Sequence, residues 1–238
     1  KLGKGILYMI PTTIGDLEDS TQNFIPPQTH QITIGLSFFI VEKVKTSRRF
    51  LRKLDPKFDI DSSTFYELNK HTNPKEIHSF LDPCRRGQDV GLLSEAGCPS
   101  VADPGSNIVA LAHKENIKVV PLVGPSSILL ALIASGLNGQ HFSFHGYLPI
   151  EKNEKLKKIR FLEKNCKNGS AQIFMETPFR NESLFSELVL NCNDNTMLCV
   201  ACNISTNEEF IKTLSIFEWR KNKPSLNKKP TIFIMGFN

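Results

Sequence analysis

The run SEAGCPSVADPG, residues 94–105, has the composition of a loop that lets a ligand approach the backbone. Gly97 and Gly105 can adopt backbone angles that other residues avoid, and Asp103-Pro104 is typical of a helix start. The loop follows a short apolar strand predicted at Val90 to Leu93. In parallel α/β sheets, ligands bind at such strand-to-helix junctions. An ordinary connection has the same form, so this loop alone does not define a site.

Two more loops of the same kind favour a binding site. Gly124 to Ser127 follows the apolar segment KVVPLV, at 118–123, and precedes a short buried helix predicted at Ile128 to Ala134. The free N–H groups of a helix start suit a carboxylate or another anion, although simple serine capping has the same appearance. The third loop, Pro11 to Asp16, follows a strand predicted at Ile6 to Ile10. We expect one small-molecule pocket lined by all three loops.

A family resemblance rests on five segments that occur in order along the chain. They are PTTIGDLED (11–19), LLSEAGCPSVADPG (92–105), PLVGPSS (121–127), FSFHGYLP (142–149) and METPFR (175–180). This combination resembles the tetrapyrrole methylase superfamily and, within it, the enzymes that methylate RNA of the small ribosomal subunit. The resemblance implies two α/β domains, S-adenosylmethionine in a cleft between them, and methyl transfer as the reaction. It also implies a homodimer, with ribosomal RNA or the small ribosomal subunit as partner.

The resemblance further implies which residues bind the methyl donor. Its motifs match here at Pro11, at Gly97, Cys98, Pro99 and Val101, at Ser126 and Ser127, at Met175, Glu176 and Thr177, and at Asn203 and Ile204. Glu95 joins this set because it ends a predicted strand, where it could bind the donor or move a proton. Glu176 ends another predicted strand and has the same two options.

Methyl transfer needs few catalytic side chains, because a sulfonium donor is already activated and the protein mainly aligns it with the acceptor. If the acceptor is a ribose hydroxyl, as the resemblance implies, a base is needed, since a neutral hydroxyl is a poor nucleophile. Glu42 is the first candidate because it ends the strand predicted at Ser37 to Val41. Arg48, in the basic segment beside it, is the second catalytic candidate. The alternative for Glu42 is an ordinary ion pair with Lys43 or Arg48.

The segment around Glu42 departs from the family pattern. Where the family enzymes have Glu followed by Asp, Thr and Arg, this chain has Glu42 followed by Lys43, Val44 and Lys45. A base therefore replaces an acid next to the proposed catalytic carboxylate. A second departure is Leu68, which stands where the family tends to have a His before an Asn.

Basic residues exceed acidic ones by five, and many of them gather in three segments, at 43–53, 152–160 and 220–229. Such clusters fit the phosphates of a nucleic acid, although the solvated face of a helix has much the same composition. The clustering, rather than the net charge, favours an RNA partner.

Strand and helix signals alternate up to about residue 140, as in a parallel sheet with crossover helices. We expect an N-terminal α/β domain at 1–140, with a mostly parallel sheet, and a C-terminal α/β domain at 141–238, with a mixed sheet. Segment 137–149 is interpreted as the connector. Other strands are expected at Lys118 to Leu122, Ala171 to Met175, Met197 to Cys202 and Thr231 to Met235, and helices at Thr46 to Leu54, Pro74 to Arg86, Asn107 to Lys114, Glu151 to Asn165 and Pro178 to Leu190.

Six cysteines in a chain without a recognisable export signal indicate reduced thiols rather than a disulfide framework. Cys199 and Cys202 form a lone Cys-x-x-Cys, and the absence of a second pair favours a structural role over a metal site. The longest apolar stretches are too short to span a bilayer, so we expect no membrane association and a cytoplasmic location.

Three functions remain open from the residues and the resemblance. The leading hypothesis is an S-adenosylmethionine-dependent methyltransferase that modifies the ribose of a cytidine in small-subunit ribosomal RNA. The second is a methylase of a tetrapyrrole or another small acceptor, and the third is a donor-binding factor without a catalytic step. A dinucleotide-dependent oxidoreductase is disfavoured because no G-x-G-x-x-G follows the first strand.

Overall fold

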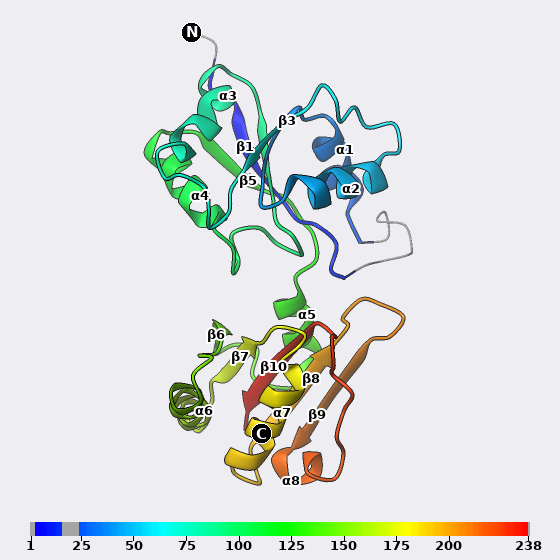
Figure 1. Ribbon diagram of the computed structural model, residues 1–238, viewed down its shortest axis with the longest axis vertical. Helices are drawn as coiled ribbons and strands as arrows, with labels where there is room; N and C mark the ends of the chain where they lie inside the picture. Colours follow the sequence, from blue (N-terminus) through cyan, green and yellow to red (C-terminus); the bar gives the residue numbers. More distant parts are fainter. Residues whose placement is uncertain (1–2, 16–23, 238) are drawn as a thin grey trace. The chain divides into compact units, whose positions relative to one another are not determined.

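A computed structural model describes residues 3–15 and 24–237, so residues 16–19 of the first motif lie outside the described residues (Figure 1). Contacts divide the chain into two units, residues 1–126 and 127–238. Each unit is an α/β layer structure built on one five-stranded sheet. The predicted fold class, with a parallel sheet followed by a mixed sheet, is confirmed.

The first sheet consists of β1 (Ile6–Ile10), β2 (Phe38–Val41), β3 (Thr64–Glu67), β4 (Val90–Leu93) and β5 (Lys118–Pro121). Their order across the sheet is β3-β2-β4-β1-β5, and every neighbouring pair is parallel. The central strands are continuous apolar runs because helices cover both of their faces. All five carboxyl ends therefore lie at one edge of the sheet, which we call the carboxyl edge.

Helices pack on both faces of this sheet. One face is covered by α4 (Gly105–Lys114), by the 3₁₀ helix η2 (Ile77–Leu81) and by α3 (Asp82–Arg85). The other face is covered by α1 (Pro27–Ile34) and α2 (Val44–Leu54). Helix α2 buries Ser47, Phe50, Leu51 and Leu54, the spacing of a helix with one apolar face.

Two features of the first unit differ from the sequence-based expectation. The single helix expected at 74–86 is instead a 3₁₀ turn followed by the four-residue α3. Pro83 explains the break, because it has no N–H to continue a helix that began upstream. Helix α1 and strand β3 were not predicted. The buried residues of α1 are Thr29 and Thr33, so its inner face carries no apolar periodicity.

The second sheet consists of β6 (Phe142–Tyr147), β7 (Ala171–Met175), β8 (Met197–Cys202), β9 (Phe210–Ser215) and β10 (Thr231–Gly236). Their order is β6-β7-β10-β8-β9, in which β6 and β7 are parallel and the other neighbours are antiparallel. The interpretation of 137–149 as a connector is therefore wrong for its middle part, since residues 142–147 form the edge strand β6. Its aromatic residues suit a strand, while Gly146 and Pro149 resemble loop signals.

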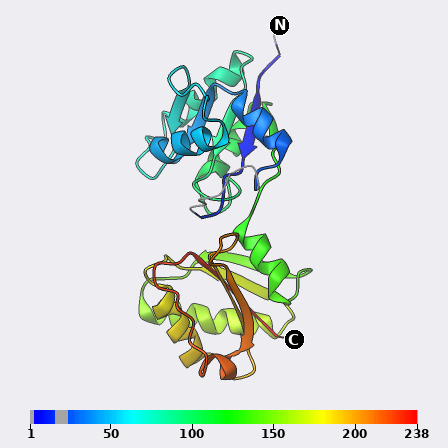
Figure 2. The same ribbon diagram turned by 90° about the vertical axis from the view of Figure 1, so that its right-hand side faces the viewer.

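Helices also cover both faces of the second sheet. On one face lie α6 (Lys152–Cys166), α7 (Asn181–Asn191) and α8 (Ile216–Trp219), and on the other lies α5 (Ser127–Ser135), as the turned view in Figure 2 shows. Because α5 buries Ala131 and Leu132 against this sheet, the contacts group it with the second unit, whereas the predicted boundary follows it.

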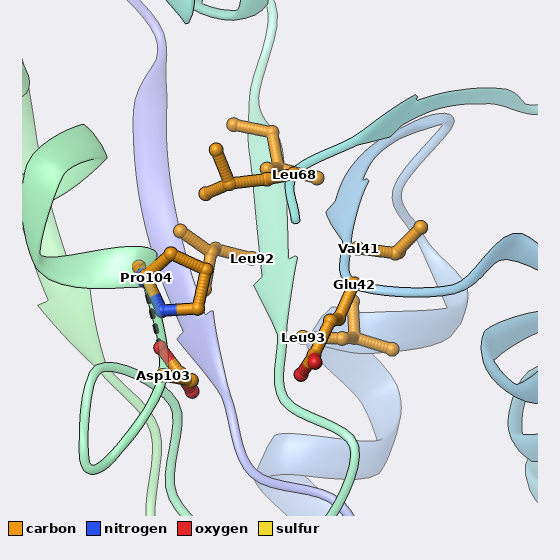
Figure 3. Close-up of a pocket in the computed structure, with 9 residues that line it drawn as sticks. Val41, Glu42, Leu68, Leu92, Leu93, Asp103 and Pro104 are labelled. Atoms are coloured by element: carbon orange, nitrogen blue, oxygen red, sulfur yellow. Dashed lines mark hydrogen bonds between the residues drawn. The ribbon is translucent and has the colours of Figure 1, made fainter. Parts of the chain in front are cut away.

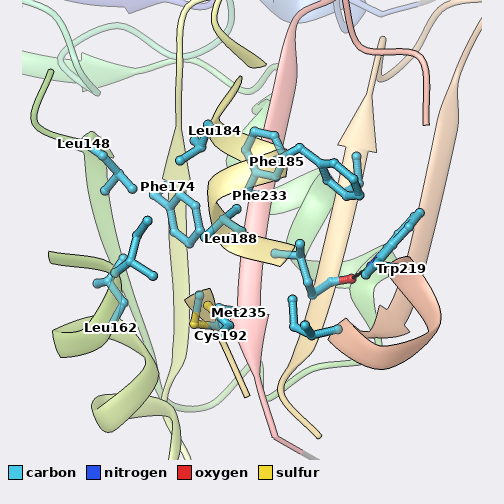
Figure 4. Packing of buried hydrophobic residues seen from close by; sticks show 14 of the residues in the cluster. Leu148, Leu162, Phe174, Leu184, Phe185, Leu188, Cys192, Trp219, Phe233 and Met235 are labelled. Atoms are coloured by element: carbon cyan, nitrogen blue, oxygen red, sulfur yellow. Dashed lines mark hydrogen bonds between the residues drawn. The ribbon is translucent and has the colours of Figure 1, made fainter. Parts of the chain in front are cut away.

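The larger core of the second unit is mainly aliphatic and contains two aromatic pairs (Figure 4). The rings of Phe174 and Phe233, from neighbouring strands, stack with centroids 5.9 Å apart. Phe185 of α7 meets the Trp219 ring edge to face at 5.5 Å, and the indole N–H of Trp219 donates to the Leu198 carbonyl at 2.8 Å. These contacts fix α7 and α8 on the sheet and thus hold the carboxyl ends of β7 and β8 in place.

All six cysteines are free thiols. Cys199 packs in the core under α5, whereas Cys202 packs in the core on the opposite face of β8. Two side chains on opposite faces of one strand cannot bind one ion. Among the described residues there is no group of three His, Cys, Asp or Glu side chains that could hold a metal. None of the described helices is long and apolar enough to cross a membrane.

Candidate active site

The loops after β1 and β4 are joined at the carboxyl edge. The Thr12 N–H donates to the Gly97 carbonyl at 2.9 Å, and the Gly97 N–H donates back to the Thr12 carbonyl at 3.2 Å. The Ser94 hydroxyl donates to the Gly97 carbonyl at 2.5 Å, and the Thr12 hydroxyl lies 3.3 Å from the Ser94 carbonyl. These bonds fix the position of Gly97, one of the predicted donor-binding residues, relative to the loop that begins at Pro11.

The loop after β5 packs against both of them. The Cys98 thiol donates to the Pro125 carbonyl at 3.4 Å. Gly97 has φ +70°, and a Cβ added there would lie 3.3 Å from that carbonyl oxygen and 3.8 Å from the Ser126 Cα. A Cβ added at Gly124 would lie 2.1 Å from the Pro11 Cγ. The structure therefore brings the predicted residues Pro11, Gly97, Cys98 and Ser126 together, with glycine required at the points of closest approach.

The rest of the second loop is held in a strained conformation. Ser100 and Ala102 both have positive φ, at 65° and 60°. The Asp103 carboxylate accepts hydrogen bonds from the Ser100 N–H at 2.9 Å and from the Gly105 N–H at 2.8 Å. The helix starts at Gly105, two residues earlier than expected, so Asp103 ties the loop to the first N–H of α4. The Ser100 hydroxyl is buried and has no hydrogen-bond partner among the described residues.

A small hollow opens beside this loop at the ends of β2 and β4 (Figure 3). Its lining residues are Ile40, Val41, Glu42, Leu68, Leu92, Leu93, Asp103, Pro104 and Gly105. The carboxylates of Glu42 and Asp103 lie at the end of the hollow away from Leu68. The hollow is thus apolar at one end and acidic at the other.

Glu42 has the electrostatic environment of a proton acceptor. Burial raises the pKa of its carboxyl, the negative charges of Glu95 and Asp103 raise it further, and Lys43 opposes them. Burial also raises the pKa of Asp103, although the hydrogen bonds that it accepts from two backbone N–H groups lower it. A carboxylate with a raised pKa holds a proton more readily than a surface carboxylate does.

Arg48 does not form the ion pair with Glu42 that was considered as an alternative, because it pairs with Asp61. The Arg48 guanidinium lies 3.5 Å from the Asp61 carboxylate, and both side chains are largely exposed. Glu95, in turn, accepts a hydrogen bond of 2.6 Å from the Thr46 hydroxyl. The loop after β4 is thereby bonded to the first turn of α2.

In the second unit, Met175, Glu176 and Thr177 lie at the carboxyl end of β7. Glu176 is 4% exposed, and its Oε1 accepts from the Thr177 N–H and from the Arg180 guanidinium, both at 2.7 Å. Burial raises the pKa of Glu176, but these hydrogen bonds outweigh it and the pKa is lowered. Its Oε2 has no partner among the described residues. Glu176 is therefore held as an ion-paired anion.

Asn203 and Ile204 follow β8. The register pairs Ile232 of β10 with Met175 and Thr231 with Cys202, so β7 and β8 end at the same edge of the second sheet. Asn203 has φ 49°, and Ile204 is buried in the core under α5. Of the other predicted residues, Pro99 and Val101 lie on the second loop, Val101 being 45% exposed, and Ser127 is the first residue of α5.

Four residues of this arrangement were not among the predicted ones. Thr12 and Ser94 join the first two loops, Gly124 makes the close approach, and Asp103 holds the second loop. Asp103 was interpreted only as a helix cap. All four lie in the motifs that carried the resemblance, so the signal was their position beside residues already chosen.

Comparison with known proteins places the chain among methylases. The family model described as tetrapyrrole (corrin/porphyrin) methylases matches residues 38–218. The ribosomal RNA small subunit methyltransferase I of Vibrio cholerae is 34% identical over 75% of this chain, which spans 57% of that relative's length. The Bacillus subtilis protein of the same name is 32% identical over 100% of this chain and 77% of its own length.

Solved structures share the fold at lower identity. The methyltransferase CobJ superposes with a TM-score of 0.65 at 17% identity, covering 98% of this chain and 94% of that one. The uroporphyrin III C-methyltransferase of Thermus thermophilus gives a TM-score of 0.58 at 18% identity, with 98% and 97% covered.

Proposed function

The chain belongs to the tetrapyrrole methylase family and is a methyltransferase that uses S-adenosylmethionine, and from this premise we propose that it methylates small-subunit ribosomal RNA, at the ribose 2′-hydroxyl of a cytidine. The observation that carries the proposal is the junction of three loops at the carboxyl edge, beside a carboxylate of raised pKa. The names of the relatives support RNA as the acceptor.

The loop after β4 carries a polar group that fits the methyl donor. In the described part of the chain, the buried Ser100 hydroxyl has no hydrogen-bond partner. A hydroxyl of this kind suits the polar groups of an amino acid or a ribose. Gly97 and Cys98 would hold the donor mainly through the backbone, with Pro11 and Ser126 beside them. When bound, the donor supplies a methyl group already activated by its sulfonium.

Glu42 is the proposed base. It stands at the end of β2, and its raised pKa suits it to accept the proton that the acceptor hydroxyl loses as its oxygen bonds to the methyl carbon. Asp103, which shares the hollow, is occupied by two backbone N–H groups and is less available. Arg48 pairs with Asp61 and is not proposed to act on the reacting atoms; it belongs instead to the basic outer surface of α2.

Met175, Thr177, Asn203 and Ile204 complete the proposed donor-binding set. Their assignment is supported by the matching motifs and by the common edge at which β7 and β8 end. Glu176 is proposed as a positioning residue, because its bond to the Thr177 N–H fixes the backbone after Met175.

The test is transfer of labelled methyl groups from S-adenosylmethionine to purified small ribosomal subunits that lack the modification. We expect label in the RNA, at one cytidine, and no label in subunits that already carry the modification. The matched variant Glu42→Gln should bind the donor but transfer little label. Label in a small molecule and none in RNA would support the methylase of a small acceptor instead, and donor binding without any transfer would support a non-catalytic factor.

A further inference from the structure

Helix α2 presents an unusually basic outer surface. Of its eleven residues, five are basic and none is acidic. Its apolar positions face the sheet, while Lys45, Arg48, Arg49 and Arg52 are exposed. A surface of this kind has to be balanced by solvent ions or by a partner.

Three of these cations form a row. Lys45, Arg49 and Arg52 are spaced i, i+4 and i+7, which places them on one side of the helix over about 10 Å of its length. We call them the basic stripe. Within the described residues, no ion pair is formed by Lys45 or Arg49. The Arg52 guanidinium donates to the Pro56 carbonyl at 2.8 Å, and its charge contributes to lowering the pKa of the Asp59 carboxyl without an ion pair between them. The stripe therefore keeps most of its positive charge.

Arg52 and Lys53 lie in the last turn of α2, where cations stabilise a helix, but the cations at its start are not explained in that way. Its first turn contains no acidic residue, and Lys43 at the N-cap makes no capping hydrogen bond through its side chain. Cations near a helix N-terminus are unfavourable because the helix dipole is positive there. Lys43 and Lys45 therefore carry a cost that a bound anion would offset.

Ion pairs neutralise part of the charge in each basic segment, and in α2 the pair joins Arg48 to Asp61. In the second segment, Lys157 pairs with Glu154 at 2.7 Å, and Lys155 lies 3.2 Å from Glu187. In the third, Arg220 pairs with Asp194. The two basic helices differ in composition, because α6 contains Glu154 and Glu163 whereas α2 contains no acidic residue.

The stripe begins next to the proposed base. Glu42 directly follows β2 and α2 starts at Val44, so the first turn of the helix lies at the carboxyl edge. The hydrogen bond from the Thr46 hydroxyl to Glu95 ties this turn to the loop after β4. A chain of phosphates held along α2 would therefore lead toward the hollow that contains Glu42.

We propose that the basic stripe binds consecutive phosphates of an RNA strand and presents the acceptor nucleotide to the carboxyl edge. This inference rests on the proposed function and names the surface that recognises its substrate. A linear row of cations matches a linear polyanion. A lipid surface fits less well, because α2 exposes no large apolar side chain to insert among acyl chains.

The test compares two triple variants with the same change of charge. One is Lys45→Gln, Arg49→Gln and Arg52→Gln; the control, on α6, is Lys157→Gln, Arg160→Gln and Lys164→Gln, which are also exposed and on one helix face. Binding to a labelled single-stranded RNA of mixed sequence is measured by fluorescence anisotropy over a series of salt concentrations. The dissociation constant of S-adenosylhomocysteine and the melting temperature show whether each variant is folded.

We expect the stripe variant to bind RNA about 50-fold more weakly at ~0.15 M salt, with the slope of log K against log salt reduced by about 2, since each single-strand phosphate contact contributes about 0.7. The control should stay within about threefold of the parent, and both variants should bind S-adenosylhomocysteine normally. Equal losses in the two variants, or an unchanged slope in the stripe variant, would overturn the inference. Because RNA binding is measured without turnover, a failure of the proposed methyl transfer would be seen separately.

Discussion

The closest contact between two of the proposed donor loops is at Gly124, and replacing it by alanine tests whether that packing matters for the donor. The new Cβ would lie 2.1 Å from the Pro11 Cγ and 2.5 Å from its Cβ. The distance between the new Cβ and the Pro11 Cγ must grow by about 1.3 Å to reach an ordinary carbon–carbon contact. The closed proline ring cannot rotate out of the way. The loops after β1 and β5 must therefore separate in Gly124→Ala.

The size of the effect follows from that displacement. A misplacement of about 1 Å costs on the order of 100-fold in a site that depends on alignment. We expect S-adenosylhomocysteine to bind Gly124→Ala roughly 30- to 100-fold more weakly, which is about 2–3 kcal/mol, as measured by isothermal titration calorimetry. The change acts on the position of the backbone, so no donor contact has to be removed for affinity to fall.

Gly139→Ala is the matched control, because its Cβ would meet no atom within 4 Å and its φ lies outside the left-handed region. It should leave the affinity unchanged. If Gly124→Ala melts at a much lower temperature, the double variant with Pro11→Gly removes the clash and should recover part of the binding. The reasoning is refuted if Gly124→Ala is folded and binds S-adenosylhomocysteine as tightly as the parent does.

Four further outcomes are expected. Glu42→Gln should lower kcat by at least ~100-fold in methyl transfer while S-adenosylhomocysteine affinity is unchanged; retained turnover would remove Glu42 as the base. A base acts only when it is ionised, so kcat should rise with pH through the pKa of Glu42, which is raised by burial and, next, by the charge of Glu95. Glu95→Gln removes that charge and should move the rising limb of the pH profile to lower pH, whereas a move to higher pH would contradict this. Glu163→Ala removes the acceptor of three hydrogen bonds in the second unit and should lower the free energy of unfolding, measured in urea, by about 3 kcal/mol. An unchanged free energy of unfolding would show that the carboxylate is dispensable. A chelator should leave the melting temperature unchanged, because Cys199 and Cys202 face opposite sides of β8, and a loss of stability would show a metal.

Strands that are buried on both faces could be predicted well from the sequence. Ala171–Met175 and Met197–Cys202 have the bounds expected, since each is a continuous apolar run between polar segments. The edge strand β6 was missed, because a strand with a partner on only one side needs less apolar sequence. Helix α1 was missed for a related reason: the buried Thr29 hydroxyl donates to the Val123 carbonyl, so a polar residue occupies a core position.

The meeting of the three loops could also be predicted, because parallel strands end at one edge and the loops that follow them must gather there. What the sequence did not indicate is how individual side chains are directed. Asp103 binds two backbone N–H groups within its loop, and Arg48 pairs with Asp61 across a turn. Such choices depend on the path of the chain in three dimensions, which spacing along the sequence does not determine.

The most direct test of the central claim is a crystal structure of this chain with S-adenosylhomocysteine. We expect the ligand to lie against the backbone of Gly97 and Cys98, with Pro11 and Ser126 within van der Waals distance and the sulfur facing the hollow that contains Glu42. A ligand bound away from the carboxyl edge of the first sheet, with these loops unchanged and closed on one another, would contradict the central claim.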